Sequence, residues 1–231
     1  MLPTYGRYSS YSSQHQDIFV VACTRQKIGG TYLEIGAGPP MFSNNTYLLE
    51  SQLSWSGVAI EINPYLVNLY NMHRKNPCLI GDASAMDYTD ILNSMNLGPR
   101  VDYLQVDIDP ATVTLETLKR IDFSRFQFSI VMFEHDYYHE VYRDTNPAVR
   151  RESREFLESF GYRRVVSDVI ESRRNPQSGE YHGPFEDWYV HPDYIEHDVW
   201  KEFDAAWVVM DPSGMNETTR SLFTRLLSDG N

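Results

Sequence analysis

Short apolar runs alternate with segments of helical periodicity along most of this chain, and most of the runs stop at a glycine or an acidic residue. Short apolar runs bounded by turn signals are typical of buried strands, and a period near 3.6 is typical of helices. The predicted strands are residues 31–35, 57–62, 78–80, 101–106, 128–133, 164–170 and 188–190. The predicted helices are residues 43–53, 64–73, 147–160 and 220–227, with Asn63 capping the second of them.

This alternation predicts an α/β fold, with a mostly parallel sheet covered by helices on both faces. The chain has 231 residues, which favours a single domain over 1–231. Residues 1–17 form a polar lead-in, either ordered or a flexible arm, and residues 192–231 form a C-terminal extension that docks on the core or serves a homo-oligomer. In such sheets ligands bind beyond the carboxyl ends of the strands.

Acidic residues stand at five of these predicted strand ends, and they are Glu34, Glu61, Asp82, Asp107 and Glu134. The first end continues into a glycine-rich turn, 33–40, in which Gly36 and Gly38 let the backbone turn tightly and let a ligand approach. A carboxylate at Glu61 can accept both hydroxyls of a ribose, and one at Asp82 can accept from an adenine amino group. The alternative is a sharp turn with solvated acidic loop ends.

The cations and glycines that hold a dinucleotide pyrophosphate are missing around this turn. No Lys or Arg lies between Lys27 and Arg74, and Met41 stands at the third-glycine position of the dinucleotide fingerprint. An acid-ringed pocket favours a cationic ligand instead. The pattern therefore favours S-adenosylmethionine, which carries an ammonium and a sulfonium but no phosphate.

Net charge, apolar runs and cysteine content limit the partners and the cellular location that we expect. A net charge of −12 makes nucleic acid a poor partner, so the prediction is no nucleic acid. No apolar run is long enough for a membrane span, and the start of the chain lacks a secretory pattern, so a cytoplasmic protein with no membrane is expected. Cys23 and Cys78 lack metal-type spacing and are expected to be buried.

Seven stretches together resemble class I methyltransferases, and more narrowly the FkbM-like family. They are residues 14–20, 32–37, 43–50, 55–61, 102–109, 134–136 and 160–162. The resemblance implies a Rossmann-like fold with a seven-stranded sheet, S-adenosylmethionine as cofactor, and methylation of a hydroxyl on a sugar-like or other small acceptor. It also implies the cofactor-binding residues, which are Glu34, Gly36, Ala37, Gly38, Asn45, Glu61, Ile62, Asp82, Ala83 and Asp107. Pro39 and Pro40 depart from the family pattern, because they stiffen the turn and remove two N–H donors.

The chemistry is expected where the fourth and fifth predicted strands end. Alternation places Asp107 and Asp109 on one side of their strand, next to Glu134 and His135. Asp107, Asp109 and His135 are the predicted catalytic residues, with His135 as general base in one interpretation. In the other, Asp109, Glu134 and His135 hold a divalent cation, Mg²⁺ or Mn²⁺. A third interpretation leaves the carboxylates only to hold the ammonium group and loop amides.

Two alternatives to O-methylation of a small-molecule or glycan acceptor stay open: N- or C-methylation, and cofactor binding without catalysis. Arg150, Arg151 and Arg154 alternate with glutamates three and four positions apart, which predicts a solvated, salt-bridged helix face rather than an anion site. Trp188 and Tyr189 are expected in the core of a late strand, with stacking on a sugar ring as the alternative.

Overall fold

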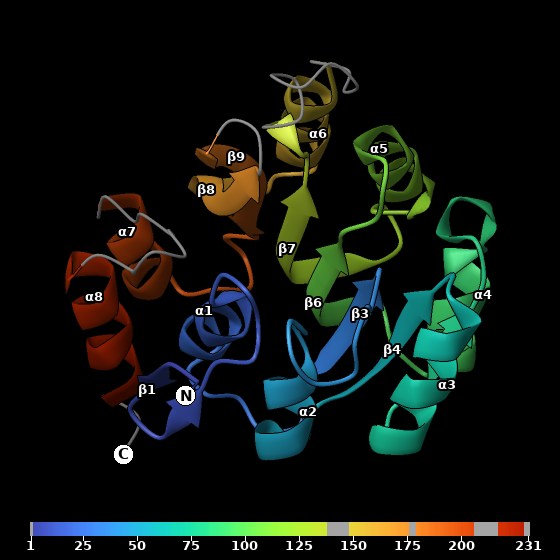
Figure 1. Cartoon of the computed structure of the whole chain (residues 1–231), viewed down its shortest axis with the longest axis horizontal. Coiled ribbons are helices and arrows are strands. Elements are labelled where there is room, and N and C mark those ends of the chain that lie inside the picture. Colours follow the sequence, from blue (N-terminus) through green and yellow to red (C-terminus); the bar gives the residue numbers. More distant parts are fainter. Residues whose placement is uncertain (1, 138–147, 176–178, 206–216, 229–231) are drawn as a thin grey trace.

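The computed structural model describes residues 2–137, 148–175, 179–205 and 217–228 of the chain (Figure 1). The strands are β1 (Thr4–Tyr5), β2 (Tyr8–Ser9), β3 (Thr31–Ile35), β4 (Ser56–Glu61), β5 (Cys78–Ile80), β6 (Arg100–Val106), β7 (Gln127–Glu134), β8 (Arg163–Asn175) and β9 (Gly179–Val190). The helices are α1 (Gln16–Cys23), α2 (Tyr47–Leu53), α3 (Pro64–His73), a short 3₁₀ turn η1 (Ala83–Ala85), α4 (Tyr88–Ser94), α5 (Ala111–Arg120), α6 (Ala148–Ser159), α7 (His197–Ala205) and α8 (Glu217–Ser228).

Seven strands form one sheet in the order β5-β4-β3-β6-β7-β9-β8. The first five run parallel, whereas β9 is antiparallel to both of its neighbours, β7 and β8. The strand order reverses between β3 and β6, and ligands of open α/β sheets bind outside the carboxyl ends of the strands at such a switch point. The predicted α/β class with a mostly parallel sheet is confirmed.

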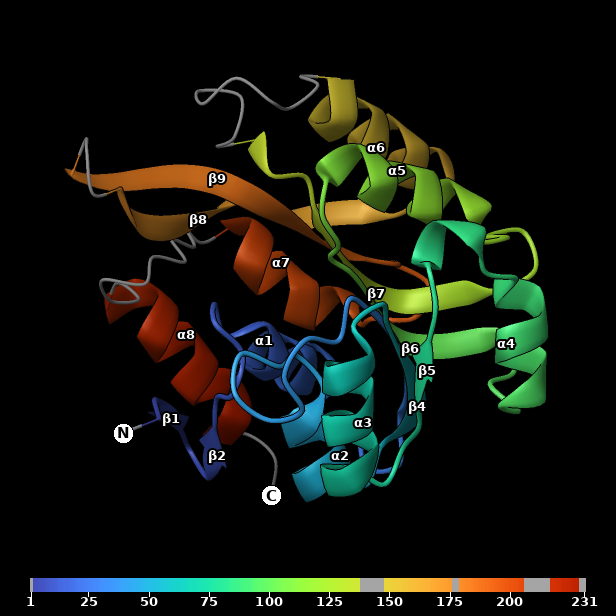
Figure 2. The same cartoon turned by 45° about the vertical axis from the view of Figure 1, so that its right-hand side comes forward.

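Alternating side chains on the strands contribute to two large hydrophobic clusters, one on each face of the sheet. Tyr32, Tyr103 and Trp188 pack with α1, α2, α7 and α8 on one face. Leu33, Leu104 and Tyr189 pack with α4, α5 and α6 on the other. Figure 2 shows α2 and α3 on one side of β4 and β5, with α4 on the opposite side. Trp188 and Tyr189 are fully buried, as expected for core residues.

The lead-in is ordered rather than a free arm. β1 and β2 form a small hairpin in which Tyr5 and Tyr8 are buried, and α8 contacts both β1 and α1 (Figures 1 and 2). The C-terminal helix therefore docks on the N-terminal part of the same chain. None of the helices among the described residues is both long and apolar enough to cross a bilayer.

Two predicted boundaries are wrong for identifiable reasons. The helix predicted from residue 43 begins at Tyr47, because the Asn44 side chain accepts the backbone N–H groups of Thr46 and Tyr47 and holds the preceding residues in a loop. The two short late strands are instead a long hairpin, β8 and β9, with register shifts around Val166 and Val169. The Asn63 cap on α3 is confirmed, since its side chain accepts from the Tyr65 N–H at 3.0 Å.

Candidate functional site

A cavity of about 460 Å³ opens at the carboxyl ends of β3, β4 and β6, which is the switch point of the sheet. All ten residues predicted to bind a cofactor line it, and they are Glu34, Gly36, Ala37, Gly38, Asn45, Glu61, Ile62, Asp82, Ala83 and Asp107. The lining also contains Pro39, Ser43, Ile60, Gly81, Ile108, Asp109 and Val113. Residues far apart in the sequence therefore meet because parallel strands end at one edge.

The glycine turn is shaped by a close approach between two strand ends. Gly36 has φ +86°, and a β-carbon there would lie 1.7 Å from the carbonyl oxygen of Asp107. Gly38 has φ +57°, and a β-carbon there would meet no atom within 4 Å. Gly36 is thus required by packing between β3 and β6, whereas Gly38 leaves open space on the cavity side.

Glu61 connects this turn to the next strand. Its carboxylate accepts the Gly38 N–H at 2.9 Å and the Asn63 N–H at 2.8 Å, which fixes the side chain at the cavity wall. Asp82 is exposed at the far wall and accepts both the N–H and the hydroxyl of Ser84. Those hydrogen bonds lower the pKa of the Asp82 carboxyl, so it is ionised at neutral pH.

Glu34 is the buried acid of the cavity. One of its oxygens accepts from the Thr46 hydroxyl at 2.8 Å and from the Asn44 amide at 3.4 Å. Burial raises the pKa of the Glu34 carboxyl to about 7, although the positive charge of Arg74 acts in the opposite direction. Glu34 therefore lies near the midpoint of its titration at neutral pH, where a cationic ligand would decide its charge.

Arg74, which sequence reasoning did not identify, braces the turn from behind. Its side chain is fully buried and pairs with Glu50 at 3.0 Å. The guanidinium also donates to the carbonyl oxygen of Pro40, to Asn44 Oδ1 and to Thr46 Oγ1, each at 3.0 Å. Arg74 is not part of the cavity lining, so its charge supports Asn44 and Thr46, which in turn hold Glu34, rather than a ligand.

The ends of β6 and β7 meet through Asp107 and Glu134. Glu134 is hydrogen-bonded to Asp107 and to Asp136. Burial and the negative charges of those two neighbours raise the pKa of Glu134 well above its usual range. Asp109 is itself exposed and also lines this cavity, so the two predicted catalytic aspartates share one wall.

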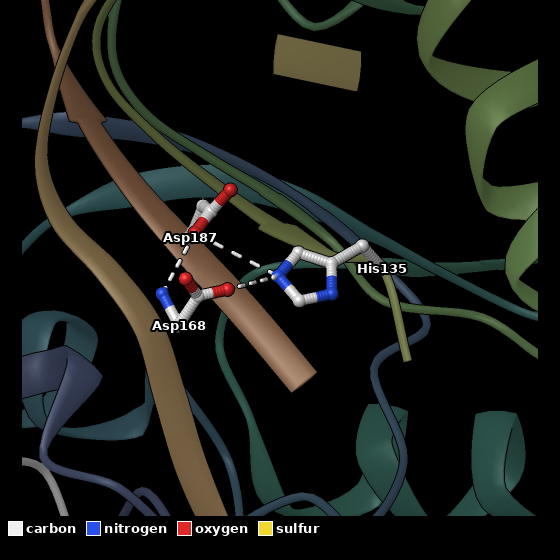
Figure 3. Close-up of side chains that lie close together, drawn as sticks. All are labelled: His135, Asp168 and Asp187. Carbon is white, nitrogen blue, oxygen red and sulfur yellow. Dashed lines mark hydrogen bonds and ion pairs between the residues drawn. The ribbon is translucent and has the colours of Figure 1, made fainter. Parts of the chain in front are cut away.

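His135 points away from that cavity, toward the β8–β9 hairpin (Figure 3). Its side chain is fully buried, with Nε2 3.6 Å from Asp187 Oδ1 and 3.7 Å from Asp168 Oδ1. Nδ1 accepts the Tyr137 N–H at 3.2 Å. The structure therefore does not bring His135 to Asp109, and both of its ring nitrogens face protein groups.

The predicted metal ligands do not form one cluster. Among the described residues, the group whose ligand atoms lie within 4.8 Å of one another is His135, Asp168 and Asp187, not Asp109, Glu134 and His135. Arg154 already binds both Asp187 oxygens at 2.6 and 2.9 Å. Arg150 and Arg154 likewise bind Asp168. These guanidiniums hold the oxygens that a divalent cation would need, so the residues present do not fit a metal.

Asp187 is the centre of this second cluster, and nothing in its local sequence marks it as such. Burial by itself would raise its pKa, but the nearby His135 ring and the hydrogen bonds from Arg154 outweigh that effect and hold the pKa of the Asp187 carboxyl well below its usual range. The cluster is a charge-compensated network that ties β7, β8, β9 and α6 together.

Comparison with known proteins gives distant similarity in fold. The sequence matches no protein-family model and no curated protein. The structure is similar to that of a putative rRNA methylase from Clostridium thermocellum, with 12% identity, 79% of this chain and 97% of that chain covered, and a TM-score of 0.49. It is also similar to a precorrin-6y C5,15-methyltransferase from Geobacter metallireducens (16% identity, 76% and 86% covered, TM-score 0.46). A third is a TehB-like SAM-dependent methyltransferase from Corynebacterium glutamicum (11%, 79% and 89%, TM-score 0.43).

Proposed function

We propose that this protein is an S-adenosylmethionine-dependent methyltransferase of the FkbM-like type, acting on a hydroxyl of a small-molecule or glycan acceptor. One observation carries the proposal. Among the described residues, the lining of the switch-point cavity has five carboxylates and no Lys, Arg or His, and the acids are Glu34, Glu61, Asp82, Asp107 and Asp109. Such a lining favours a ligand with an ammonium and a sulfonium and disfavours a pyrophosphate.

The residues around the cavity fit the parts of that cofactor. We assign Glu61 to the ribose hydroxyls, since its oxygens are already oriented by two backbone N–H groups. Asp82, Ala83 and Ile62 surround the place of the adenine at the exposed end. Glu34 and the Gly36–Gly38 turn, together with Asn45, are assigned to the methionine half.

Bound S-adenosylmethionine supplies an electrophilic methyl group on a sulfonium. The protein has to orient the acceptor, exclude water and take up the acceptor's proton. We assign proton uptake to Asp109, the exposed carboxylate at the reacting end, with Asp107 beside it. His135 acts at a distance by fixing the segment that leads into Tyr137. The absence of a fitting metal cluster among the described residues leads us to propose a reaction that needs no divalent cation.

The two cysteines are free and buried, which suits a reducing compartment, and we propose the cytoplasm. The acidic cavity also supports the absence of a nucleic-acid partner at this site. N- or C-methylation and cofactor binding without turnover remain competing functions, and the identity of the methylated product separates them from O-methylation.

Isothermal titration with S-adenosylhomocysteine tests the pocket, with NAD⁺ as the contrasting ligand. We expect saturable binding of S-adenosylhomocysteine and none of NAD⁺, and the reverse result would overturn the proposal. The reaction is tested by transfer of labelled methyl to a panel of hydroxy acceptors, including chelator-treated enzyme. Asp109→Asn should abolish turnover while cofactor binding persists, and Glu116→Gln, an exposed change on α5, should leave both intact.

A further inference from the structure

A second cavity, of about 370 Å³, lies between α6 and the start of β8, and arginines dominate its wall. Its arginines are Arg150, Arg151, Arg154 and Arg164. Two glutamates of α6 and Tyr137 complete the lining. In a chain with a net charge of −12, this concentration of guanidiniums contrasts with the first cavity, which has none.

The sequence predicted a solvated, salt-bridged face for Arg150, Arg151 and Arg154, and of these three the structure shows it only for Arg151. Its guanidinium lies 3.8 Å from Glu155, and both side chains are 69% exposed. Arg150 and Arg154 turn inward instead, toward Asp168 and Asp187. The buried Asp187 and the half-buried Asp168 therefore hold two planar guanidinium groups in fixed orientations at the cavity wall.

The carboxylates behind the wall cannot satisfy all of these donors. Each guanidinium carries five N–H donors. Asp187 Oδ1 also accepts the Asp168 N–H at 2.8 Å, and Oδ2 accepts the Tyr189 hydroxyl at 3.3 Å. The acceptor capacity of Asp187 is thus shared with groups outside the arginines. Among the described residues, Arg150 Nε and Arg164 Nη1 are buried and have no hydrogen-bond partner, so donors of this wall are left for a ligand. A planar oxyanion is the ligand that such oriented forks bind well.

The exposed side of the wall can also contribute to binding such a ligand. Arg151 is exposed and only loosely paired, so its guanidinium can turn to a ligand at little cost. The Tyr137 ring lies 4.3 Å from the Arg150 guanidinium carbon and forms a flat side to the cavity. The fixed donors of Arg150 and Arg154 on one side and the loosely paired guanidinium of Arg151 on the other could thus contact one ligand from two sides.

The arginine cavity lies beside the reacting end of the first cavity. Tyr137 follows Glu134 by three residues, and Glu134 contacts Asp107, which lines the acidic cavity. The strand end of β7 thus separates an acidic cavity from a basic one. An acceptor with an anionic group would be repelled by the acids and held by the arginines, with its hydroxyl directed to the strand end.

We propose that the arginine cavity binds a carboxylate or phosphate group of the methyl acceptor, so that the acceptor is an anionic hydroxy compound such as an acidic or phosphorylated sugar. This inference rests on the proposed methyltransferase function. It names a substrate class for the same reaction and gives Arg151 and Arg164 the role of binding residues.

The test uses the full-length protein saturated with S-adenosylhomocysteine and follows the arginine Nε–H signals by NMR. Inorganic phosphate and acetate are titrated separately at constant ionic strength, with chloride as the balancing anion. We expect saturable shifts for the cavity arginines with at least one of the two anions, and the stronger anion identifies a phosphate or a carboxylate acceptor. Linear shifts, or equal shifts with chloride, overturn the inference.

Arg151→Gln and Arg164→Gln are the test variants, and Arg125→Gln, which lies against Phe126 in the α5–β7 loop, is the matched control. Loss of one guanidinium contact should weaken anion binding roughly tenfold, and the control should not change it. Unchanged anion binding in both test variants contradicts the inference. If S-adenosylhomocysteine binds but neither anion does, only the inference fails; if anions bind and S-adenosylhomocysteine does not, the proposed function fails.

Discussion

The molecule contains two groups of buried or half-buried carboxylates that differ in what balances their charge. In the switch-point cavity, the acids line open space, and the part of the chain that the structure describes adds no cationic side chain to the lining. In the cluster between β7 and the β8–β9 hairpin, Asp168 and Asp187 are bound by Arg150, Arg154 and His135. We call the switch-point cavity the incomplete region, because its carboxylates face open space. We call the second group the completed cluster, because arginines and His135 pair with its carboxylates.

This difference indicates what each region does. Burying a carboxylate costs several kcal/mol, on the order of 3–5, when its partner is missing, so the protein completes a charge pair where the role is structural. Where it leaves carboxylates facing a cavity, a ligand has to supply the positive charge. Arg74 fits this view, because it compensates charge behind Glu34 without entering the cavity.

The largest effect is expected in the completed cluster. Asp187→Asn leaves Arg154 without its main buried partner, and we expect a loss of about 3–5 kcal/mol in the free energy of unfolding at pH 7. Urea denaturation measures it. Because the pKa of Asp187 is depressed in the folded state, its contribution is present above about pH 4, the unfolded value, and is lost as the pH falls toward the folded value.

Asp198→Asn is the control for that variant, since Asp198 is an exposed partner of Arg25 and its removal should change the free energy of unfolding far less. Affinity for S-adenosylhomocysteine should survive in folded Asp187→Asn protein. Equal destabilisation by both variants would contradict the structural role assigned to Asp187. Loss of cofactor affinity with normal stability would contradict it as well.

The second-largest effect is expected from a steric clash introduced into the incomplete region. Gly36→Ala puts a β-carbon 1.7 Å from the Asp107 carbonyl oxygen, so the ends of β3 and β6 must separate. We expect S-adenosylhomocysteine affinity to fall by about a hundredfold or more, roughly 2.7 kcal/mol. Gly38→Ala is the matched variant, and its positive φ should cost only about 1–2 kcal/mol of stability. Calorimetric titration of both proteins decides, and similar affinities would refute the packing argument.

The incomplete region was also the more predictable one. Each of its acids lies at or within three residues of the carboxyl end of a strand, and the rule that ligands bind at the carboxyl ends of parallel strands brings Glu34, Glu61 and Asp107 together without further information. The boundaries of β3, α3 and β5 follow from local signals such as the Asn63 cap and Pro64.

The completed cluster depends on register, which local sequence does not encode. His135 meets Asp187 only because β9 runs antiparallel to β7, and Asp168 reaches them from a bulged part of β8 with φ +58°. The direction of Arg150 and Arg154 is likewise a tertiary choice, because helical spacing offered glutamate partners on the same helix. Sequence reasoning therefore found the acids that line the cavity and missed Asp168 and Asp187, which pair with arginines.

A smaller effect is expected from removing the negative charge of Glu61, which we assign to the ribose of the cofactor. Glu61→Gln keeps one acceptor for the turn but loses the charge and the second strong acceptor, so we expect S-adenosylhomocysteine to bind about ten- to a hundredfold more weakly. Stability should change little, since Glu61 is half-buried. Glu116→Gln should match the unmodified protein in the same titration, and a Glu61→Gln protein with full affinity would exclude the ribose assignment.

The smallest effect is a pH dependence that comes from Glu34. Its pKa of about 7 lies above the unfolded value, so ionising it lowers the stability of the free protein as pH rises from about 4.5 to 7. The cofactor ammonium favours the ionised form, so affinity for S-adenosylhomocysteine should fall about tenfold between pH 8 and pH 6. Glu34→Gln should flatten this profile. Arg74→Gln should move the midpoint to higher pH, because a positive charge that lowers the Glu34 pKa is gone, whereas Arg74→Lys should keep it. A midpoint that stays fixed in Arg74→Gln would show that the buried arginine only braces the turn and does not set the charge of the cavity.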